Sequence, residues 1–261
     1  MNWNKTKNFL IVLFSLINLY LIIRTSSTVL NFKPATKVNS EAVSDTVNIL
    51  KKNYGIEIDK DIIPIKTVNL NNIEVENIIY TEKFSLSDIN FNLDGSKFFA
   101  SVKTDGTETK SDIKNEAERF LDKIGIRNGY YKLEFSDSDH KCNAVGTVSN
   151  YKIYNNIITF EFNGSQMNVD GQWYIPKTKN VYAHDSSHKM SEITNILIKA
   201  APEISENNHK SIVKIDYGYC VSIIDSNTVN KSASAVACYV IQTDGDFKYY
   251  YDALNGKMIN R

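Results

Sequence analysis

Proline, glycine and cysteine are scarce in this chain of 261 residues. Four prolines and eleven glycines are too few for a collagen-like chain or a proline-rich low-complexity chain. Only three cysteines are present and none forms a Cys-x-x-Cys pair, so the sequence indicates neither a zinc ribbon nor a redox motif. Hydrophobic residues make up 42% of the chain and charged residues 23%, which excludes a chain that is disordered throughout.

The sequence motifs of common enzyme classes are also missing. The chain has no Gly-x-Ser-x-Gly elbow, no P-loop and no dinucleotide-binding glycine pattern. His184 and His188 have the i, i+4 spacing of a helical metal site, but Asp185 stands where a zinc peptidase needs glutamate as its general base. Acidic residues are scattered, so a catalytic carboxylate pair has no positive support. We therefore expect a protein without catalytic residues, metal ligands or a cofactor.

The chain lacks an excess of charge of either sign, since 30 Lys and Arg residues balance 30 Asp and Glu residues. This balance argues against nucleic-acid binding, which needs a concentrated positive field. The charges are nevertheless unevenly distributed, because the first 24 residues hold three basic side chains and no acidic one. The other 237 residues carry 27 basic and 30 acidic side chains, a net charge of −3. The N-terminal end is therefore distinct from the rest of the chain.

One long hydrophobic run follows the basic N-terminus directly. Residues 9–23 contain no charged side chain, and only Ser15 and Asn18 among them are strongly polar. As a helix this run covers about 22 Å, and the long basic side chains on both flanks extend it to a plausible membrane span. The sequence therefore predicts a transmembrane anchor over residues 9–24, surrounded by membrane lipid.

A cleaved signal peptide is the alternative, because it also joins a basic segment to an apolar one. No Ala-x-Ala cleavage pattern follows the run, and Arg24 stands directly against it, so a retained anchor is the better interpretation. A short basic N-terminus favours the cytoplasmic side of the membrane for residues 1–8. We therefore expect a single-pass protein of the cell membrane, with residues 25–39 as a tether and the C-terminal region extracellular.

Four residues of the predicted anchor are candidates for contact with another membrane helix. Ser15 and Asn18 are three positions apart and share a helix face, which Ile11 and Ile22 extend by one turn each way. An asparagine amide in hydrocarbon gains about 0.6–2 kcal/mol from a hydrogen bond to a neighbouring helix. The alternative is a tolerated polar residue near the outer end of a short span.

The remaining sequence alternates between helical and strand patterns. Apolar residues at helical spacing predict three helices, which begin near residues 40, 111 and 191. Ser40 is the expected N-cap of the first helix, and Gly55, Gly125 and Pro202 are the expected ends of the three. Turns are expected at residues 94–95, 155–156 and 244–246. The predicted strands are Ile62–Val68, Ile73–Tyr80, Ile89–Leu93, Phe98–Val102, Tyr130–Phe135, Val145–Tyr154, Ile157–Phe162, Ile212–Ile224, Ala235–Thr243 and Phe247–Tyr251.

This order of elements predicts an α+β fold after the transmembrane helix. A helix followed by three or more strands occurs three times, which favours repeated units of one helix packed on an antiparallel sheet. We assign residues 40–175 to a first extracellular α+β subdomain, or several, and residues 176–261 to a C-terminal α+β subdomain.

Aromatic and cysteine residues provide the other candidates for a site. Trp173 and Tyr174, and the run of Tyr249, Tyr250 and Tyr251, are a possible extracellular interface, since Tyr and Trp dominate interface hot spots. The alternative is that they pack in the core. On a strand, Tyr249 and Tyr251 would share one face and Tyr250 the other.

The cysteines allow two interpretations as well. Cys220 and Cys238 lie in neighbouring predicted strands, so a disulfide bridge between them is conceivable outside the cell. Buried free thiols that pack as small apolar residues are the alternative, and they suit the odd number of cysteines.

The N-terminus resembles that of the YycI family. These proteins are membrane-anchored regulators of the YycFG (WalRK) two-component system of Gram-positive bacteria. Trp3, Lys5, Thr6 and Lys7, followed by an apolar span with a late Asn18, match the start of that family. The resemblance implies a non-enzymatic regulator of an essential sensor histidine kinase, YycG or WalK, that acts through transmembrane and extracellular contacts.

The C-terminus is similar to the closing hairpin of the same family and to PepSY-type modules. The similarity rests on residues 237–240, the three tyrosines at 249–251, Asp252, Ala253, and Gly256 with Lys257. It implies an extracellular domain related to the sister protein YycH, and a complex of the chain with a YycH-like protein and the kinase. The alternative function is an exported PepSY-like inhibitor or chaperone of a cell-wall protease or hydrolase.

Overall fold

The computed structural model describes residues 7, 13–15, 17–18, 35–80, 90–94, 97–104, 109–136, 140–177, 190–222 and 232–259. The chain divides into two units, Met1–Pro34 and Ala35–Arg261. The described residues of the first unit are helical, and its apolar side chains Leu13, Phe14 and Ile17 are exposed. None of the helices within the described ranges is long and apolar enough to cross a membrane.

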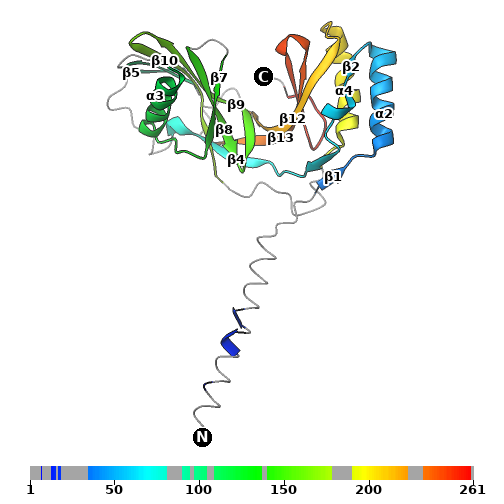
Figure 1. Cartoon of the computed structure of the whole chain (residues 1–261), viewed down its shortest axis with the longest axis horizontal. Coiled ribbons are helices and arrows are strands. Elements are labelled where there is room, and N and C mark those ends of the chain that lie inside the picture. Colours follow the sequence, from blue (N-terminus) through cyan, green and yellow to red (C-terminus); the bar gives the residue numbers. More distant parts are fainter. Residues whose placement is uncertain are drawn as a thin grey trace. The chain divides into compact units, whose positions relative to one another are not determined.

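The second unit is a mixed α+β structure built on one large sheet (Figure 1). Its main path runs β11-β4-β13-β12-β9-β10-β6-β5, while β14 pairs with β13, β2 with β12, and β7 with β8, which itself pairs with β9. Strands β1 (Ala35–Lys37) and β3 (Lys66–Val68) form a separate pair. The strands of the large sheet are β2 (Glu57–Ile58), β4 (Ile73–Asn77), β5 (Asn90–Asp94), β6 (Lys97–Lys103), β7 (Tyr131–Phe135), β8 (Lys141–Val148), β9 (Tyr151–Asn163), β10 (Gln166–Gly171), β11 (Tyr174–Pro176), β12 (Ser211–Ser222), β13 (Ser232–Thr243) and β14 (Lys248–Asp252).

Three α-helices occur at the positions that the apolar stripes predict. They are α2 (Ser40–Ile49), α3 (Lys110–Lys123) and α4 (Ile193–Glu206). Helix α2 continues as a π-helical turn, Leu50–Tyr54, and ends at Gly55, whose φ of 67° is left-handed as a C-terminal glycine requires. The N-cap of α2 is Asn39 rather than Ser40, because the Asn39 side chain accepts a hydrogen bond from the Glu41 amide.

The predicted end of the third helix at Pro202 is wrong. Helix α4 continues through this proline to Glu206. Ala200, Ala201 and Ile204 around it are fully buried, so packing of the apolar stripe keeps the last turn helical although proline donates no backbone hydrogen bond.

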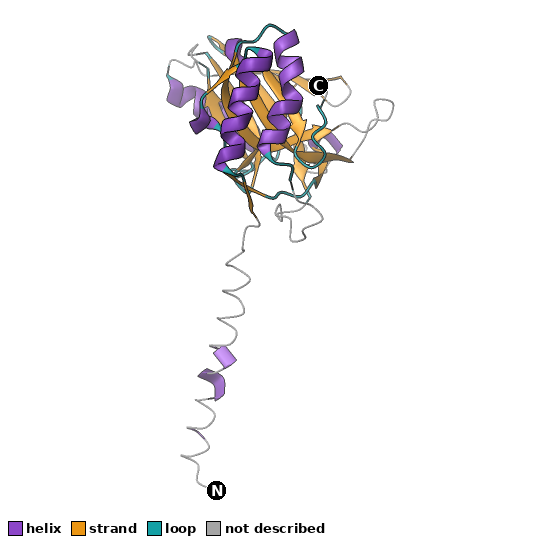
Figure 2. Ribbon diagram, turned by 90° about the vertical axis from the view of Figure 1, so that its right-hand side faces the viewer, coloured by secondary structure: helices purple, strands orange, loops and turns teal. Residues whose placement is uncertain are grey.

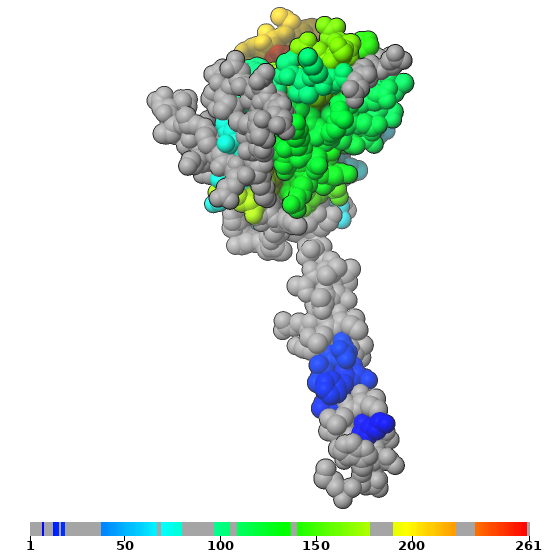
Figure 3. Space-filling view, turned by 90° about the vertical axis from the view of Figure 1, so that its left-hand side faces the viewer, coloured from blue at the N-terminus to red at the C-terminus, as the bar shows by residue number. Residues whose placement is uncertain are grey.

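The unit has two main hydrophobic cores. The first core combines α2 and α4 with strands β12, β13 and β14, and Figure 2 shows the two helices side by side over the strands. The second core combines α3 with strands β6, β8, β9 and β10, and its helix and strands form the green surface in Figure 3. The expectation of one helix for each sheet is therefore wrong, because α2 and α4 share a core and all three helices lie against one sheet.

The first core also joins distant parts of the sequence. It draws on residues 38–75 as well as on residues 190–253, which lie on opposite sides of the predicted boundary at 175. Strand β4 pairs with β13, so an early segment extends the sheet of the C-terminal part. The boundary between the two predicted subdomains itself stays a prediction.

The predicted turn at residues 155–156 is wrong, and the strand there is unbroken. Strand β9 runs from Tyr151 to Asn163, and the actual turn before it is formed by Ser149 and Asn150, both with positive φ. The pairing of β8 with β9 shifts register at this point, from Val145↔Ile157 to Gly146↔Ile153. Three residues of β9 therefore bulge out of the ladder, which bends the strand.

The other turns and strands agree more closely with the pattern. Strands β5 and β6 pair with Asp94 opposite Lys97, as expected for a hairpin whose turn lies outside the described residues. Residues 244–246 connect β13 to β14 as predicted. The predicted strand Ile62–Val68 is shorter, since Lys60–Ile62 forms a 3-10 turn and only Lys66–Val68 is extended.

Candidate functional site

The predicted transmembrane face is only partly described. Ser15 and Asn18 lie in helical turns and are exposed, whereas Ile11 and Ile22 lie outside the described residues. The role of this face in contacting another helix stays a prediction.

The five aromatic residues proposed as an exposed interface lie in the core instead. Trp173, Tyr174, Tyr249, Tyr250 and Tyr251 are each at most 3% exposed. The tyrosines of β14 alternate as predicted, with Tyr249 and Tyr251 in the first core and Tyr250 in a third, smaller cluster. Both faces of β14 are covered, which is why no ring of this run forms an exposed patch. The packing alternative is therefore correct.

Cys142, Cys220 and Cys238 are all buried. Cys238 lies opposite Gly218 and Cys220 opposite Val236, so the two thiols are offset along the antiparallel pair. Burial raises the pKa of the Cys142 thiol to about 12. The Cys142 thiol therefore remains protonated at physiological pH and packs as a small apolar side chain.

Two asparagines join the strands where the sheet bends. Asn155 exchanges two hydrogen bonds with the backbone of Val221, 2.6 and 2.8 Å long, and Asn156 exchanges two with that of Tyr174, 2.7 and 2.9 Å long. Each side-chain amide therefore makes the pair of hydrogen bonds that a neighbouring strand would otherwise supply. It joins two strands that have no backbone hydrogen bonds to each other at that point. No sequence motif could have revealed this role, because adjacent asparagines are also typical of turns.

Two glycines allow the close approach of strands at the bend. A Cβ on Gly146 would lie 2.3 Å from the amide nitrogen of Asn156, and a Cβ on Gly218 would lie 2.5 Å from the carbonyl oxygen of Lys152. Any larger residue would push β8 away from the Asn156 amide or β12 away from β9. The bend therefore depends on the Asn156 side chain, which fills the space beside Gly146 that a larger residue would occupy.

A groove of about 570 Å³ lies between strands β7–β9 and strands β12–β14. The first wall carries Glu134, Val145 and Ile157. Alternate residues of the same strands, such as Ala144 and Ile158, face the second core, so the groove lies on the side of the sheet away from α3. This volume is in the range of small-ligand sites, about 300–1,000 Å³.

The opposite wall has the same organisation. Lys214, Asp216 and Val240 face the groove, whereas the alternating residues Ile215 and Ile241 face the first core. Each half of the sheet therefore buries one face under helices and turns its other face toward the groove.

Six charged side chains line the groove, three acidic and three basic. Glu134 pairs with Lys152, and Lys214 lies 2.6 Å from Asp216. Asp246 accepts a 2.7 Å hydrogen bond from Gln242. The groove therefore has no net charge, and its two ion pairs are partly exposed, with side-chain exposures between 30% and 56%.

The floor of the groove is apolar and aromatic. Tyr154 and Tyr250 meet edge to face, with ring centroids 6.1 Å apart. Tyr250 belongs to the third cluster, with Cys220, Cys238 and Val240, and Tyr154 packs against that cluster. Burial, reinforced by the nearby Asp216 carboxylate, raises the pKa of Tyr154. Its hydroxyl group is therefore protonated at physiological pH and can donate a hydrogen bond.

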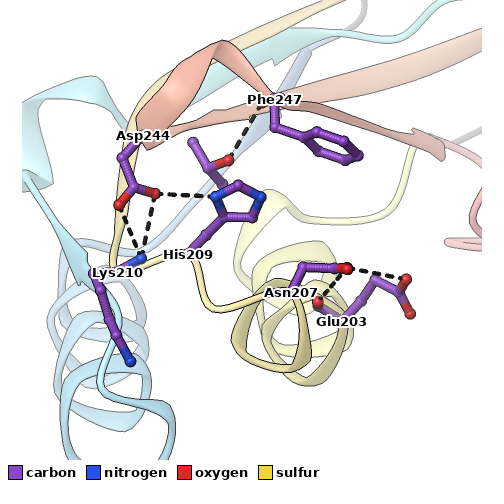
Figure 4. A network of polar contacts seen from close by, with 7 residues as sticks. Glu203, Asn207, His209, Lys210, Asp244 and Phe247 are labelled. Atoms are coloured by element: carbon purple, nitrogen blue, oxygen red, sulfur yellow. Dashed lines mark hydrogen bonds and ion pairs between the residues drawn. The ribbon is translucent and has the colours of Figure 1, made fainter.

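A polar clasp lies next to the β13–β14 turn (Figure 4). The Asp244 carboxylate accepts hydrogen bonds of 3.1 and 3.2 Å from the Lys210 backbone amide and lies 3.3 Å from Nδ1 of His209. The His209 ring packs against the exposed ring of Phe247, with ring centroids 5.3 Å apart. The clasp therefore ties the β13–β14 turn to the start of β12 and positions Phe247.

These groups make the groove a candidate binding site. Within the described ranges, no group of three or more His, Cys, Asp or Glu side chains could hold a metal ion. The acidic groups of the groove are held by lysine or amide partners, which suits recognition of a ligand through hydrogen bonds and ion pairs. Among the candidate residues that fall within the described ranges, only Tyr250 lines the groove.

Comparison with known proteins does not assign the chain to a family. No protein-family model matches the chain, and no curated protein matches it. The candidate site is therefore defined by its own residues.

Proposed function

We propose that the chain is a non-enzymatic regulator of a membrane sensor histidine kinase of the YycG or WalK type. The observation that carries this proposal is the combination of a basic start, with Trp3, Lys5, Thr6 and Lys7, and an apolar run containing Asn18. The run precedes a compact α+β unit that begins at Ala35. In this proposal residues 9–24 anchor the protein, residues 1–8 are cytoplasmic and the folded unit is extracellular.

The finer description of the fold is part of the same proposal. It regards the second unit as a YycH-like and YycI-like domain whose C-terminal hairpin is PepSY-like. The mixed α+β composition and the β13–β14 hairpin are compatible with this relationship.

Regulation in this proposal depends on differential binding. A partner shifts the equilibrium between two kinase states only if it binds one state more tightly than the other. The anchor face of Ile11, Ser15, Asn18 and Ile22 provides one contact inside the membrane, and the extracellular unit provides another, together with a YycH-like protein.

Two measurements on the full chain test the proposal. Protease added to intact cells should degrade the Ala35–Arg261 unit, and complete protection of this unit would exclude an extracellular location. Purification of the tagged full chain from detergent-solubilised membranes should recover a sensor histidine kinase. If the kinase is absent under conditions that retain other membrane complexes, the regulatory role is wrong.

The alternative is an exported PepSY-like inhibitor or chaperone of a cell-wall protease or hydrolase. The observation that favours it is the turn after β14, where Asp252 accepts hydrogen bonds from the amides of Leu254 and Asn255 and Gly256 has a φ of 68°. This turn returns the chain after β14, so that Met258 forms a bridge with Tyr251. Recovery of a protease in place of a kinase would favour this alternative.

A further inference from the structure

We propose that two copies of this chain associate by antiparallel pairing of their β7 strands. Within the described ranges β7 pairs with β8 alone, so its other side is an edge of the large sheet. An open edge presents backbone donors and acceptors that can pair with a further strand. The sequence of β7, Tyr-Lys-Leu-Glu-Phe, indicates that this further strand is a second β7.

Two backbone hydrogen bonds show which residues of β7 face its open edge. The Thr147 amide donates to the Tyr130 carbonyl group at 2.8 Å. The Ser136 amide donates to the Lys141 carbonyl group at 3.1 Å. The even-numbered residues of this segment therefore face β8. Backbone groups of successive residues in a strand point to opposite sides, so three residues of β7 direct theirs outward, namely Tyr131, Leu133 and Phe135.

Strand β7 is complementary to itself when two copies pair about Leu133. Leu133 then lies opposite Leu133 of the second copy, and Lys132 lies opposite Glu134. The outermost pair is Tyr131 with Phe135, which is 39% exposed in the single chain. Outward-facing residues meet outward-facing residues in this register, so their amide and carbonyl groups all find partners. Aromatic pairs and pairs of opposite charge also stabilise such a ladder, and the two-fold symmetry makes each pair occur twice.

The charges of β7 select this register over its neighbours. A shift that keeps outward-facing residues opposite each other moves the centre of the pairing by one residue. The centre then falls on Lys132 or on Glu134, and two like charges face each other directly, which is destabilising. Lys132 is exposed, and the Glu134 side chain is 38% exposed beside Lys152, so both charges can reach a neighbouring strand.

Other outer strands of the sheet are protected against such pairing. At β11, the Asn156 side chain occupies the amide and carbonyl groups of Tyr174, and Pro176 offers no donor. At β14, the returning chain lies alongside, and the Ile259 amide donates to the Tyr250 carbonyl group at 2.8 Å. Strand β7 has no proline and, among the described residues, no such covering segment.

Charge reversal in the purified full chain tests the pairing. Sedimentation equilibrium in density-matched detergent micelles should show a dimer that dissociates on dilution. Lys132→Glu places a carboxylate opposite Glu134, and Glu134→Lys places an ammonium group opposite Lys132, so each variant should weaken dimerisation about tenfold. An equimolar mixture of the two variants again has opposite charges at both positions and should dimerise as the unmodified chain does. Lys52→Glu, at an exposed position after α2, should have no effect.

A cysteine at the centre of the pairing provides a second test, which decides the matter if a charge variant does not fold by circular dichroism. Opposite residues of a hydrogen-bonded pair have Cα atoms about 5.5 Å apart, a distance that a disulfide spans. Oxidation with copper phenanthroline should therefore join two copies of Leu133→Cys. Val213→Cys, at a position on β12 that is 48% exposed, should not cross-link to a comparable extent.

The proposal is wrong if the full chain is monomeric at every concentration tested, or if either charge variant dimerises as well as the unmodified chain. It is also wrong if the mixture dimerises no better than its components, or if Leu133→Cys cross-links no more than Val213→Cys. Association through the N-terminal apolar run alone would survive both charge reversals and is thereby distinguished. These measurements need no kinase, so their outcome is independent of the proposed regulatory function.

Discussion

At the residue scale, Asn156 joins two strands by its side chain alone. Asn156 is 1% exposed, and its side-chain amide makes two hydrogen bonds to the backbone of Tyr174. Asn156→Ala would leave a buried backbone donor and acceptor without partners, so we expect a loss of about 2–4 kcal/mol in the free energy of unfolding. Urea unfolding followed by circular dichroism measures this loss.

Gly146 provides the control for this explanation. Gly146→Ala places a methyl group where the Asn156 amide lies, so it should destabilise the protein on its own. In the Asn156→Ala background the space is free and the same change should cost less, a coupling that a double-mutant cycle reveals. Strictly additive losses would show that the two residues do not share this space.

The clasp at Asp244 should make stability depend on pH. The Lys210 backbone amide, which donates to the carboxylate, holds the pKa of Asp244 below its ordinary value of 3.8. The clasp therefore contributes fully above the ordinary pKa, and its contribution is lost as the pH falls through the lower pKa of the folded state. Asp244→Asn should flatten the decrease in stability below about pH 4, measured by thermal unfolding.

Lys210→Ala is the matched control for the clasp, because the donor to Asp244 is the main-chain amide and not the lysine side chain. This variant should retain the acid-dependent decrease. If it flattens the profile as Asp244→Asn does, the side chain rather than the amide lowers the pKa.

At the element scale, helix α4 contains a proline in its interior. From the sequence alone, this proline is expected to end the helix. Pro202 is exposed and lies within the helix, where it removes the hydrogen bond to the carbonyl of Ile198. Pro202→Ala restores that donor, at the cost of a more flexible unfolded chain, so we expect a gain of about 1–2 kcal/mol in stability. Glu206→Ala at the exposed end of α4 should change the melting temperature much less, and a loss of stability in Pro202→Ala would contradict this account.

Elements were predictable where their signal is local. The three helices follow from apolar stripes, and the hairpins at residues 94–97 and 243–248 follow from their turn residues. Asn155 and Asn156 are typical turn residues, and the local sequence predicts a turn there. Their actual partners, Val221 and Tyr174, are distant in sequence, so no local pattern reveals them. Pairing of β4 with β13 depends on the same kind of non-local contact, which periodicity does not encode.

At the scale of the whole molecule, the candidate site is the feature that the sequence reveals least. Glu134, Lys152 and Asp216 belong to no motif, and each looks like an ordinary polar residue on the wet face of a strand. They become a site only because the bend in β9 turns two such faces toward one groove. The proposed anchor is the opposite case, since the evidence for it lies in a continuous run of sequence.

The last prediction concerns the association of the full chain with its proposed kinase partner in the membrane. Helix contacts in lipid depend on packing and on polar groups that find partners, so Asn18 has the most to lose on its face. Asn18→Leu makes the span more apolar and should preserve insertion, while the kinase contact weakens by about 1 kcal/mol, or about fivefold in affinity. Co-purification from membranes at matched expression measures this change. Leu10→Asn alters a different face, so a complex that is lost in Leu10→Asn and intact in Asn18→Leu would show that the helix binds through that other face.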